Sequence, residues 1–172
     1  MLKCILLYGV CILRIQTFQK PSEDFSIFNT CVSSFTFKLS EENSVKITDV
    51  GVSKDAKDIT GTFTGTPVYI APEVFHSEVY DSKADIYSFG IILWEMWYGR
   101  QAFAEVRGPM TALFSLVDEG YQPGDVKGGK KPPARWKKLM SQCWDRNPDQ
   151  RPSAEFCNQE ITILSQAVVR PL

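Results

Sequence analysis

The sequence predicts a single, mainly α-helical domain, and three observations support this fold class. Residues 80–99 are apolar around nearly the whole circumference of a helix that has clear start and stop signals. Apolar residues recur at helical spacing in three later segments, residues 109–116, 133–144 and 153–168. The length of 172 residues is typical of one domain.

The composition describes a globular chain without an overall charge bias. Hydrophobic residues make up 44% of the chain and the formal net charge is -1, so nothing global attracts nucleic acid or an anionic membrane. The five cysteines form no C-x-x-C pair, and the single histidine, His76, leaves little for a metal site. We therefore expect a reducing compartment, no zinc or disulfide scaffold and no nucleic-acid partner.

Residues 1–34 form a first segment that is apolar and then irregular. The apolar run Cys4–Leu13 has the length of a signal-peptide core, about half of what a membrane span needs. The residues that follow it, through Gln19, offer no small-x-small cleavage site. We therefore expect a buried strand or helix, a cytoplasmic location and no membrane span, with a secretory signal as the alternative.

The second segment, residues 35–168, opens with a predicted β-hairpin. Apolar residues alternate with polar ones on both sides of a polar turn at residues 40–44, at positions Phe35, Phe37, Leu39, Val45 and Ile47. Asp49 follows the second strand just before a glycine. That position often holds an exposed functional carboxylate.

Between Gly51 and Pro72 the composition becomes that of a loop. Glycine and proline recur, and threonine occupies alternate positions: Thr60, Thr62, Thr64 and Thr66. A loop of this length is uncommon unless it is functional. Two interpretations stay open, namely a regulated loop with exposed hydroxyls and a Thr-rich edge strand over residues 59–66.

The four predicted helices follow. Ser82 and Asp85 have the spacing of a capping box, and Gly99 is placed to end the helix. A helix that is apolar on all sides is buried, so residues 80–99 should lie at the centre with the amphipathic helices around them. Ser153 after Pro152 predicts the start of the last helix.

A basic run without an acid lies in and before the third of these helices: Lys127, Lys130, Lys131, Arg135, Lys137 and Lys138. Charge runs are usually a solvated face, and we interpret this one in that way. Docking of an acidic partner is the alternative.

Four motifs stand in a fixed order over residues 36–167. They are Lys46-Ile47-Thr48-Asp49-Val50-Gly51, the stretch from Gly65 through Pro72-Glu73, the stretch from Ser82 through Trp94-Glu95, and Cys143-Trp144 with Asn147 through Arg151-Pro152-Ser153. In this order they resemble the C-terminal lobe of a eukaryotic protein kinase, in the tyrosine-kinase-like branch and with a serine/threonine-type activation segment.

The resemblance implies a nucleotide and metal role for Asp49. It matches the aspartate that holds Mg²⁺ on the phosphates of ATP, so it is the candidate metal-binding and cofactor-binding residue. Val50 replaces the phenylalanine that usually follows. The implied cofactors are ATP and Mg²⁺, and the implied partner is a protein substrate or a regulatory protein.

The resemblance also assigns roles after Asp49. The candidate phosphosites of the activation loop are Thr60, Thr62 and Thr64, and the substrate-docking loop contains Thr66, Pro67 and Tyr69. Glu73 and Arg151 match a buried pair that ties the activation segment to the last helices. Asp85 matches the aspartate that anchors the backbone of the catalytic loop. These three residues are expected to be structural.

Other parts of the kinase pattern do not match. We find no Gly-rich loop, no strand lysine and no H-R-D-x-x-x-x-N catalytic loop, and the family register places Cys31 at the catalytic base. No catalytic residue is identified, and we expect the N-terminal lobe and the catalytic loop to be missing. The full-length form would phosphorylate serine and threonine with ATP, whereas this chain as written would be inactive. The alternatives are a non-catalytic binding or regulatory module and a chain that does not fold.

Overall fold

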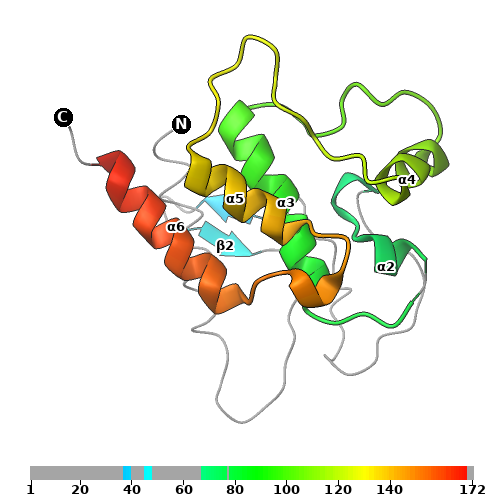
Figure 1. Ribbon diagram of the computed structural model, residues 1–172, viewed down its shortest axis with the longest axis horizontal. Coiled ribbons are helices and arrows are strands. Elements are labelled where there is room, and N and C mark those ends of the chain that lie inside the picture. Colours follow the sequence, from blue (N-terminus) through cyan, green and yellow to red (C-terminus); the bar gives the residue numbers. More distant parts are fainter. Residues whose placement is uncertain (1–36, 40–44, 48–66, 77, 170–172) are drawn as a thin grey trace.

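The computed structural model describes residues 37–39, 45–47, 67–76 and 78–169, with side chains described for residues 67–76 and 78–164. The described part is mainly helical, which confirms the predicted fold class (Figure 1). Its elements in chain order are β1 (Phe37–Leu39), β2 (Val45–Ile47), η2 (Pro67–Tyr69), α2 (Pro72–Phe75), α3 (Lys83–Tyr98), α4 (Met110–Asp118), α5 (Ala134–Cys143), η3 (Pro148–Gln150) and α6 (Ala154–Val169).

The two strands lie within the segments where alternation predicted them. β1 pairs with β2 in antiparallel orientation, with Phe37 opposite Ile47 and Leu39 opposite Val45. The turn at residues 40–44 lies outside the described residues, so the connection that would make this pair a hairpin stays a prediction.

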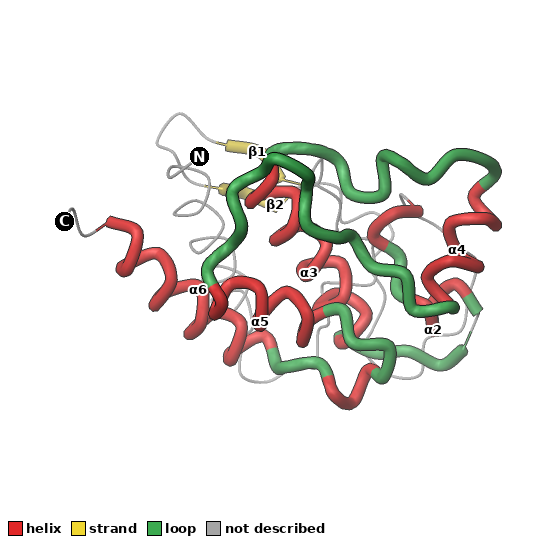
Figure 2. The backbone as a smooth tube through the Cα atoms, turned by 45° about the horizontal axis from the view of Figure 1, so that its top comes forward, coloured by secondary structure: helices red, strands yellow, loops and turns green. Residues whose placement is uncertain are grey.

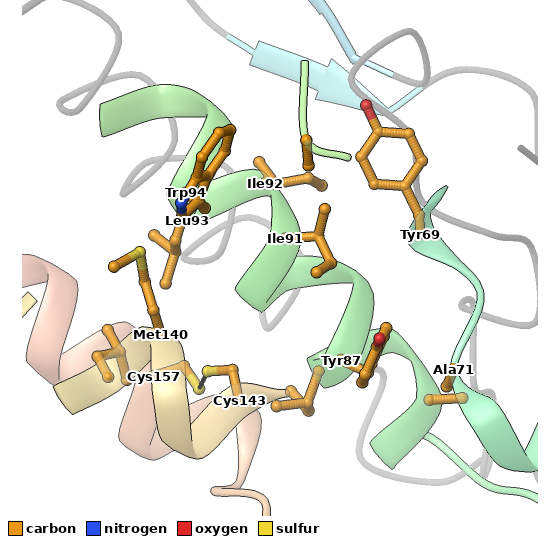
Figure 3. Close-up of a cluster of buried hydrophobic side chains, with 14 of the residues drawn as sticks. Tyr69, Ala71, Tyr87, Ile91, Ile92, Leu93, Trp94, Met140, Cys143 and Cys157 are labelled. Carbon is orange, nitrogen blue, oxygen red and sulfur yellow. Dashed lines mark hydrogen bonds between the residues drawn. The ribbon is translucent and has the colours of Figure 1, made fainter. Parts of the chain in front are cut away.

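Helix α3 lies at the centre of the described part, as its uniformly apolar sequence predicted. Ile91, Ile92 and Leu93 are successive residues that point in different directions around a helix, yet each is at most 1% exposed. Figure 3 shows side chains of α3 between Tyr69 on one side and Met140 of α5 on the other. Burial on all faces gives α3 a favourable contribution from every turn, because each buried apolar side chain contributes about 1.5–3 kcal/mol.

The start of α3 differs from its prediction. Ser82 is the N-cap residue, but its side chain makes no capping hydrogen bond. Asp81 Oδ1 instead accepts a hydrogen bond of 2.8 Å from the backbone N–H of Lys83. The predicted capping box is therefore wrong, because the residue before Ser82 supplies the acceptor. At the other end Gly99 has φ 64°, a left-handed conformation that favours glycine, and it ends the helix as predicted.

Helix α5 packs on α3, and helix α6 packs on α5. Trp136, Leu139 and Met140 of α5 are each at most 2% exposed and belong to the core that also contains α3. Gly90 permits this close approach, because a Cβ atom at that position would lie 2.9 Å from the Cβ atom of Cys143. α6 packs on α5, and Ser153 Oγ caps α6 by accepting a hydrogen bond from Phe156 N–H, as predicted.

The boundaries of the outer helices agree with the predictions to within two residues, since the structure gives Met110–Asp118, Ala134–Cys143 and Ala154–Val169. Within the described part of the chain, no helix is long and apolar enough to cross a membrane. The predicted N-terminal segment, residues 1–34, lies outside the described residues.

Candidate functional site

The segment Pro67–Tyr69 (η2) lies against α3, and Tyr69 makes the central contacts. Tyr69 is 3% exposed, and its hydroxyl donates a hydrogen bond of 2.8 Å to Glu95 Oε2. Ser88 Oγ donates a hydrogen bond of 2.7 Å to the carbonyl oxygen of Tyr69. Both the backbone and the ring of Tyr69 are therefore fixed by α3. Tyr69 therefore attaches the predicted docking loop to α3 and is itself buried.

Glu95 connects this loop to the chain that follows α3. While Oε2 accepts from Tyr69, Oε1 accepts a hydrogen bond of 2.9 Å from the backbone N–H of Ala102. The sequence motif contains Glu95, but these two hydrogen bonds were not predicted from it. The available signal was a carboxylate near the end of a helix that is otherwise apolar on all sides, which requires hydrogen-bonding partners if it is covered.

Glu73 and Arg151, which are 78 positions apart in the sequence, form a buried bidentate ion pair. Arg151 Nη1 donates to Glu73 Oε1 at 2.6 Å, and Nη2 donates to Oε2 at 2.9 Å. The side chain of Arg151 is 0% exposed and that of Glu73 is 6% exposed. Parallel contacts of this kind are among the strongest charge-assisted hydrogen bonds, and they fix orientation as well as distance. The pair joins α2 to the chain immediately after η3.

Further groups satisfy the guanidinium of Arg151. Its Nε donates to the carbonyl oxygen of Asp145 at 2.7 Å, and Nη1 also donates to that of Lys83 at 2.9 Å. Its Cζ lies 5.2 Å from the ring centroid of Tyr87, within cation–π range. In return, Lys83 Nζ donates to the carbonyl oxygen of Arg151. A buried charge that is so fully paired orders three segments at once, namely α2, the start of α3 and the η3 region.

Asp85 is the third predicted structural residue, and its environment is different. Its Oδ2 is buried and accepts no hydrogen bond within the described part of the chain. Burial raises the pKa of Asp85 well above its ordinary value, and the neighbouring Asp81 adds to this increase. A buried acceptor without a donor costs free energy. Among the described residues, Oδ2 of Asp85 is an unsatisfied polar atom in the first turn of α3.

A second contact holds α2 on α4. The rings of Phe75 and Phe114 stack with centroids 3.7 Å apart, and His76 Nε2 lies 2.8 Å from Asp118 Oδ1. This contact was not predicted from the sequence, in which His76 was interpreted only as a possible metal ligand. No local pattern marks a contact between residues 42 positions apart.

The remaining predicted site residues have no described position. Cys31, Asp49, Thr60, Thr62, Thr64 and Thr66 all lie outside the described residues. Within the described residues, no group of three or more His, Cys, Asp or Glu side chains could hold a metal ion. The predicted Mg²⁺ residue, Asp49, is thus not among the groups whose geometry is known.

Two of the described residues with strongly raised pKa values lie in or close to α3. Burial raises the pKa of the Cys143 thiol well above its ordinary value, as it does for Asp85, and Cys143 lies against Cys157 in the core. Cys143 is 0% exposed. What this arrangement can do is hold the stretch from Tyr69 to Glu73 in a fixed place, because Tyr69 is bonded to Glu95 of α3 and Glu73 to Arg151.

Known proteins are similar to this chain over most of its length. Residues 37–161 match the family described as protein tyrosine and serine/threonine kinase. Mitogen-activated protein kinase kinase kinase 7 of Homo sapiens is 38% identical over 120 residues, which cover 70% of this chain and 19% of that protein. "Probable serine/threonine-protein kinase drkB" of Dictyostelium discoideum is 36% identical over 132 residues, covering 76% of this chain and 19% of that protein.

A third relative, "Probable serine/threonine-protein kinase drkA" of Dictyostelium discoideum, is 33% identical over 142 residues, which cover 82% of this chain and 22% of that protein. The chain therefore spans about a fifth of the length of these curated relatives. The family match covers the buried Glu73–Arg151 pair and the central helix α3. The chain belongs to the protein tyrosine and serine/threonine kinase family.

Proposed function

We propose that the full-length form of this protein kinase phosphorylates serine and threonine residues of proteins, with ATP and Mg²⁺ as cofactors. The observation that carries the proposal is the double anchoring of the segment Pro67–Phe75, in which Tyr69 bonds to Glu95 of α3 and Glu73 bonds to Arg151 after η3. In this family the loop at that place receives the residue to be phosphorylated. The motif Thr66-Pro67 supports serine and threonine as acceptors.

Each predicted residue has a distinct part in this proposal. Asp49 would hold Mg²⁺, and bound Mg-ATP would supply the phosphoryl group. Phosphorylation of Thr60, Thr62 or Thr64 would order the activation loop by adding about two negative charges. Glu73 and Arg151, which are buried, and Asp85, whose Oδ2 is buried, would act by holding the segments around the site in position.

The first experiment tests the chain by itself. We expect the purified chain to transfer no phosphate from labelled Mg-ATP to a protein substrate such as casein, because Cys31 occupies the position of the catalytic base. A thiol with an ordinary pKa does not orient an acceptor hydroxyl as a carboxylate does. Saturable ATP binding with phosphate transfer that Asp49→Ala abolishes would overturn this expectation.

A second experiment tests the serine/threonine assignment. The segment from Lys46 to Leu164 would replace the matching segment of mitogen-activated protein kinase kinase kinase 7. We expect the chimera to phosphorylate serine or threonine, and the same chimera with Asp49→Ala to be inactive although it melts at the same temperature. A folded chimera that phosphorylates only tyrosine, or nothing, would contradict the proposal.

A non-catalytic binding or regulatory module is the second candidate function. The observation in its favour is the match of Cys31 to the position of the catalytic base. The two candidates differ in one result: a regulatory module leaves the chimera inactive even when the catalytic loop of the relative is present, whereas a kinase lobe leaves it active.

A further inference from the structure

Six basic side chains lie on the surface between residues 127 and 138, and no acid occurs in that stretch. We call them the basic surface: Lys127, Lys130, Lys131, Arg135, Lys137 and Lys138. All six are exposed. They come from the loop before α5 and from the first two turns of that helix. The chain as a whole has a formal net charge of -1, so this concentration of positive charge is local.

The nearby acids do not neutralise the basic surface. Asp125 pairs with Lys137 at 3.0 Å, and Glu160 pairs with Arg135 at 2.6 Å. The hydrogen bond from Lys137 lowers the pKa of Asp125, and the one from Arg135 lowers the pKa of Glu160. Both acids are therefore ionised at neutral pH and already engaged. Four members form no ion pair within the described part of the chain: Lys127, Lys130, Lys131 and Lys138.

The loop that carries these lysines is held in place by α3. It passes over the C-terminal end of that helix before α5 begins (Figure 1). Figure 2 shows the same loop running from α4 across α3 to α5. Trp94 Nε1 donates to the carbonyl oxygen of Gly124 at 3.0 Å, and Trp97 Nε1 donates to that of Lys130 at 2.7 Å. Tyr98 donates to Asp125 at 2.9 Å. A loop ordered in advance loses little conformational entropy when it binds a partner.

The side chains between the lysines indicate the chemical class of that partner. The one aromatic residue of the stretch, Trp136, is 2% exposed, so residues 127–138 themselves offer no exposed ring to stack on a nucleic-acid base or to enter a membrane interface. Lysine presents a compact charge with freely rotating donors, which suits carboxylates that arrive in several orientations. These features favour an extended acidic stretch of a protein.

We propose that the basic surface is a docking site for an Asp- and Glu-rich segment of a partner protein. Complementary charges of this kind mainly accelerate association and select the partner, and their effect is weakened by salt. The proposal does not depend on phosphate transfer, because the basic surface includes none of the residues assigned to nucleotide, metal or substrate. It holds equally for a kinase lobe and for a regulatory module.

The test measures binding of a fluorescent peptide of alternating Asp and Glu residues to the whole chain. In one variant, Lys127, Lys130 and Lys131 are all replaced by Gln. The matched control replaces Arg100, Arg107 and Arg146 by Gln, which removes the same charge outside the basic surface. We expect the lysine variant to bind about tenfold more weakly and the arginine variant to bind nearly as the unaltered chain does. Replacing the three lysines by Arg should preserve binding.

Three results would overturn the proposal. The first is no saturable binding of the acidic peptide at about physiological ionic strength. The second is an equal loss in the lysine and arginine variants, which would show a response to net charge alone. The third is tighter binding of a single-stranded oligonucleotide, or of vesicles that contain phosphatidylserine, than of the peptide. The three lysines make no ion pair within the described part, so their replacement should leave thermal unfolding unchanged.

Discussion

The Glu73–Arg151 pair shows how much one residue can contribute to this lobe. Its two side chains are buried and hydrogen-bonded to one another, and Arg151 reaches the carbonyl oxygens of two further segments. We expect Glu73→Gln to lower the free energy of unfolding by about 3–5 kcal/mol, because the guanidinium would remain buried without its counter-charge. Urea denaturation followed by circular dichroism measures this change.

The exposed pair Lys137–Asp125 provides the control for that experiment. Its side chains are 59% and 37% exposed, so solvent screens their attraction. Lys137→Gln should leave the urea midpoint almost unchanged. If both substitutions shifted the midpoint equally, the stabilising role that burial gives the Glu73–Arg151 pair would be contradicted.

Asp85 leads to a prediction about pH. Its pKa is raised in the folded chain, so the folded state binds this proton more tightly than the unfolded state does. The stabilising contribution of the Asp85 carboxyl is fully present below pH 3.8, the ordinary pKa of the group. It is lost as the pH rises through the higher pKa of the folded state. Asp85→Asn removes the ionisable group, and the variant should gain stability over the unaltered chain as the pH rises.

The measurement is the difference in free energy of unfolding between Asp85→Asn and the unaltered chain, taken from about pH 4 to pH 8. A difference curve removes the contributions of Asp125 and Glu160, whose pKa values move in the opposite direction. A flat difference curve, or one that falls with pH, would contradict the environment assigned to Asp85.

At the scale of elements, the contact between α3 and α5 depends on Gly90. Alanine in place of glycine normally stabilises a helix by about 1 kcal/mol. At position 90 the added Cβ would lie 2.9 Å from the Cβ atom of Cys143, so we expect Gly90→Ala to destabilise by about 1–3 kcal/mol instead. Gly124→Ala is the control, because nothing lies within 4 Å of a Cβ atom there. Thermal unfolding of both variants decides the sign.

The two predicted helix caps form a matched pair. Ser153 Oγ accepts the hydrogen bond of Phe156 N–H at 3.2 Å, whereas the side chain of Ser82 makes no capping bond. Ser153→Ala should therefore cost about 1 kcal/mol, and Ser82→Ala should cost almost nothing. Chemical denaturation of the two variants measures both values. A larger loss for Ser82→Ala would restore the capping box that the sequence predicted.

For the whole molecule, the central position of α3 predicts one cooperative unfolding transition. Trp94 and Trp136 are buried in the same core, on α3 and α5. Tryptophan fluorescence and far-ultraviolet circular dichroism should therefore give the same urea midpoint. Separate midpoints, or the absence of any transition, would favour the interpretation that the chain does not fold by itself.

The sequence by itself determined the four longer helices, α3 to α6, and the family. Helix α3 could be predicted because its apolar residues and its terminal glycine are local signals, and the kinase motifs are short runs of neighbouring residues. For the same reason the N-cap at Ser153 was predicted correctly. The predicted capping box at Ser82 failed because a hydrogen bond from Lys83 N–H goes to Asp81, and several polar residues near a helix start can serve as its acceptor.

Only the tertiary structure decided which distant residues meet. These contacts connect residues between 26 and 42 positions apart in the sequence. They are the hydrogen bond from Tyr69 to Glu95, the hydrogen bond between His76 and Asp118, and the hydrogen bonds from Trp94 and Trp97 of α3 to the lysine-bearing loop. Such contacts depend on how the helices pack, because packing brings together side chains that have no periodic relation in the sequence. A basic run in the sequence became a defined surface only when the structure showed which of its charges are paired.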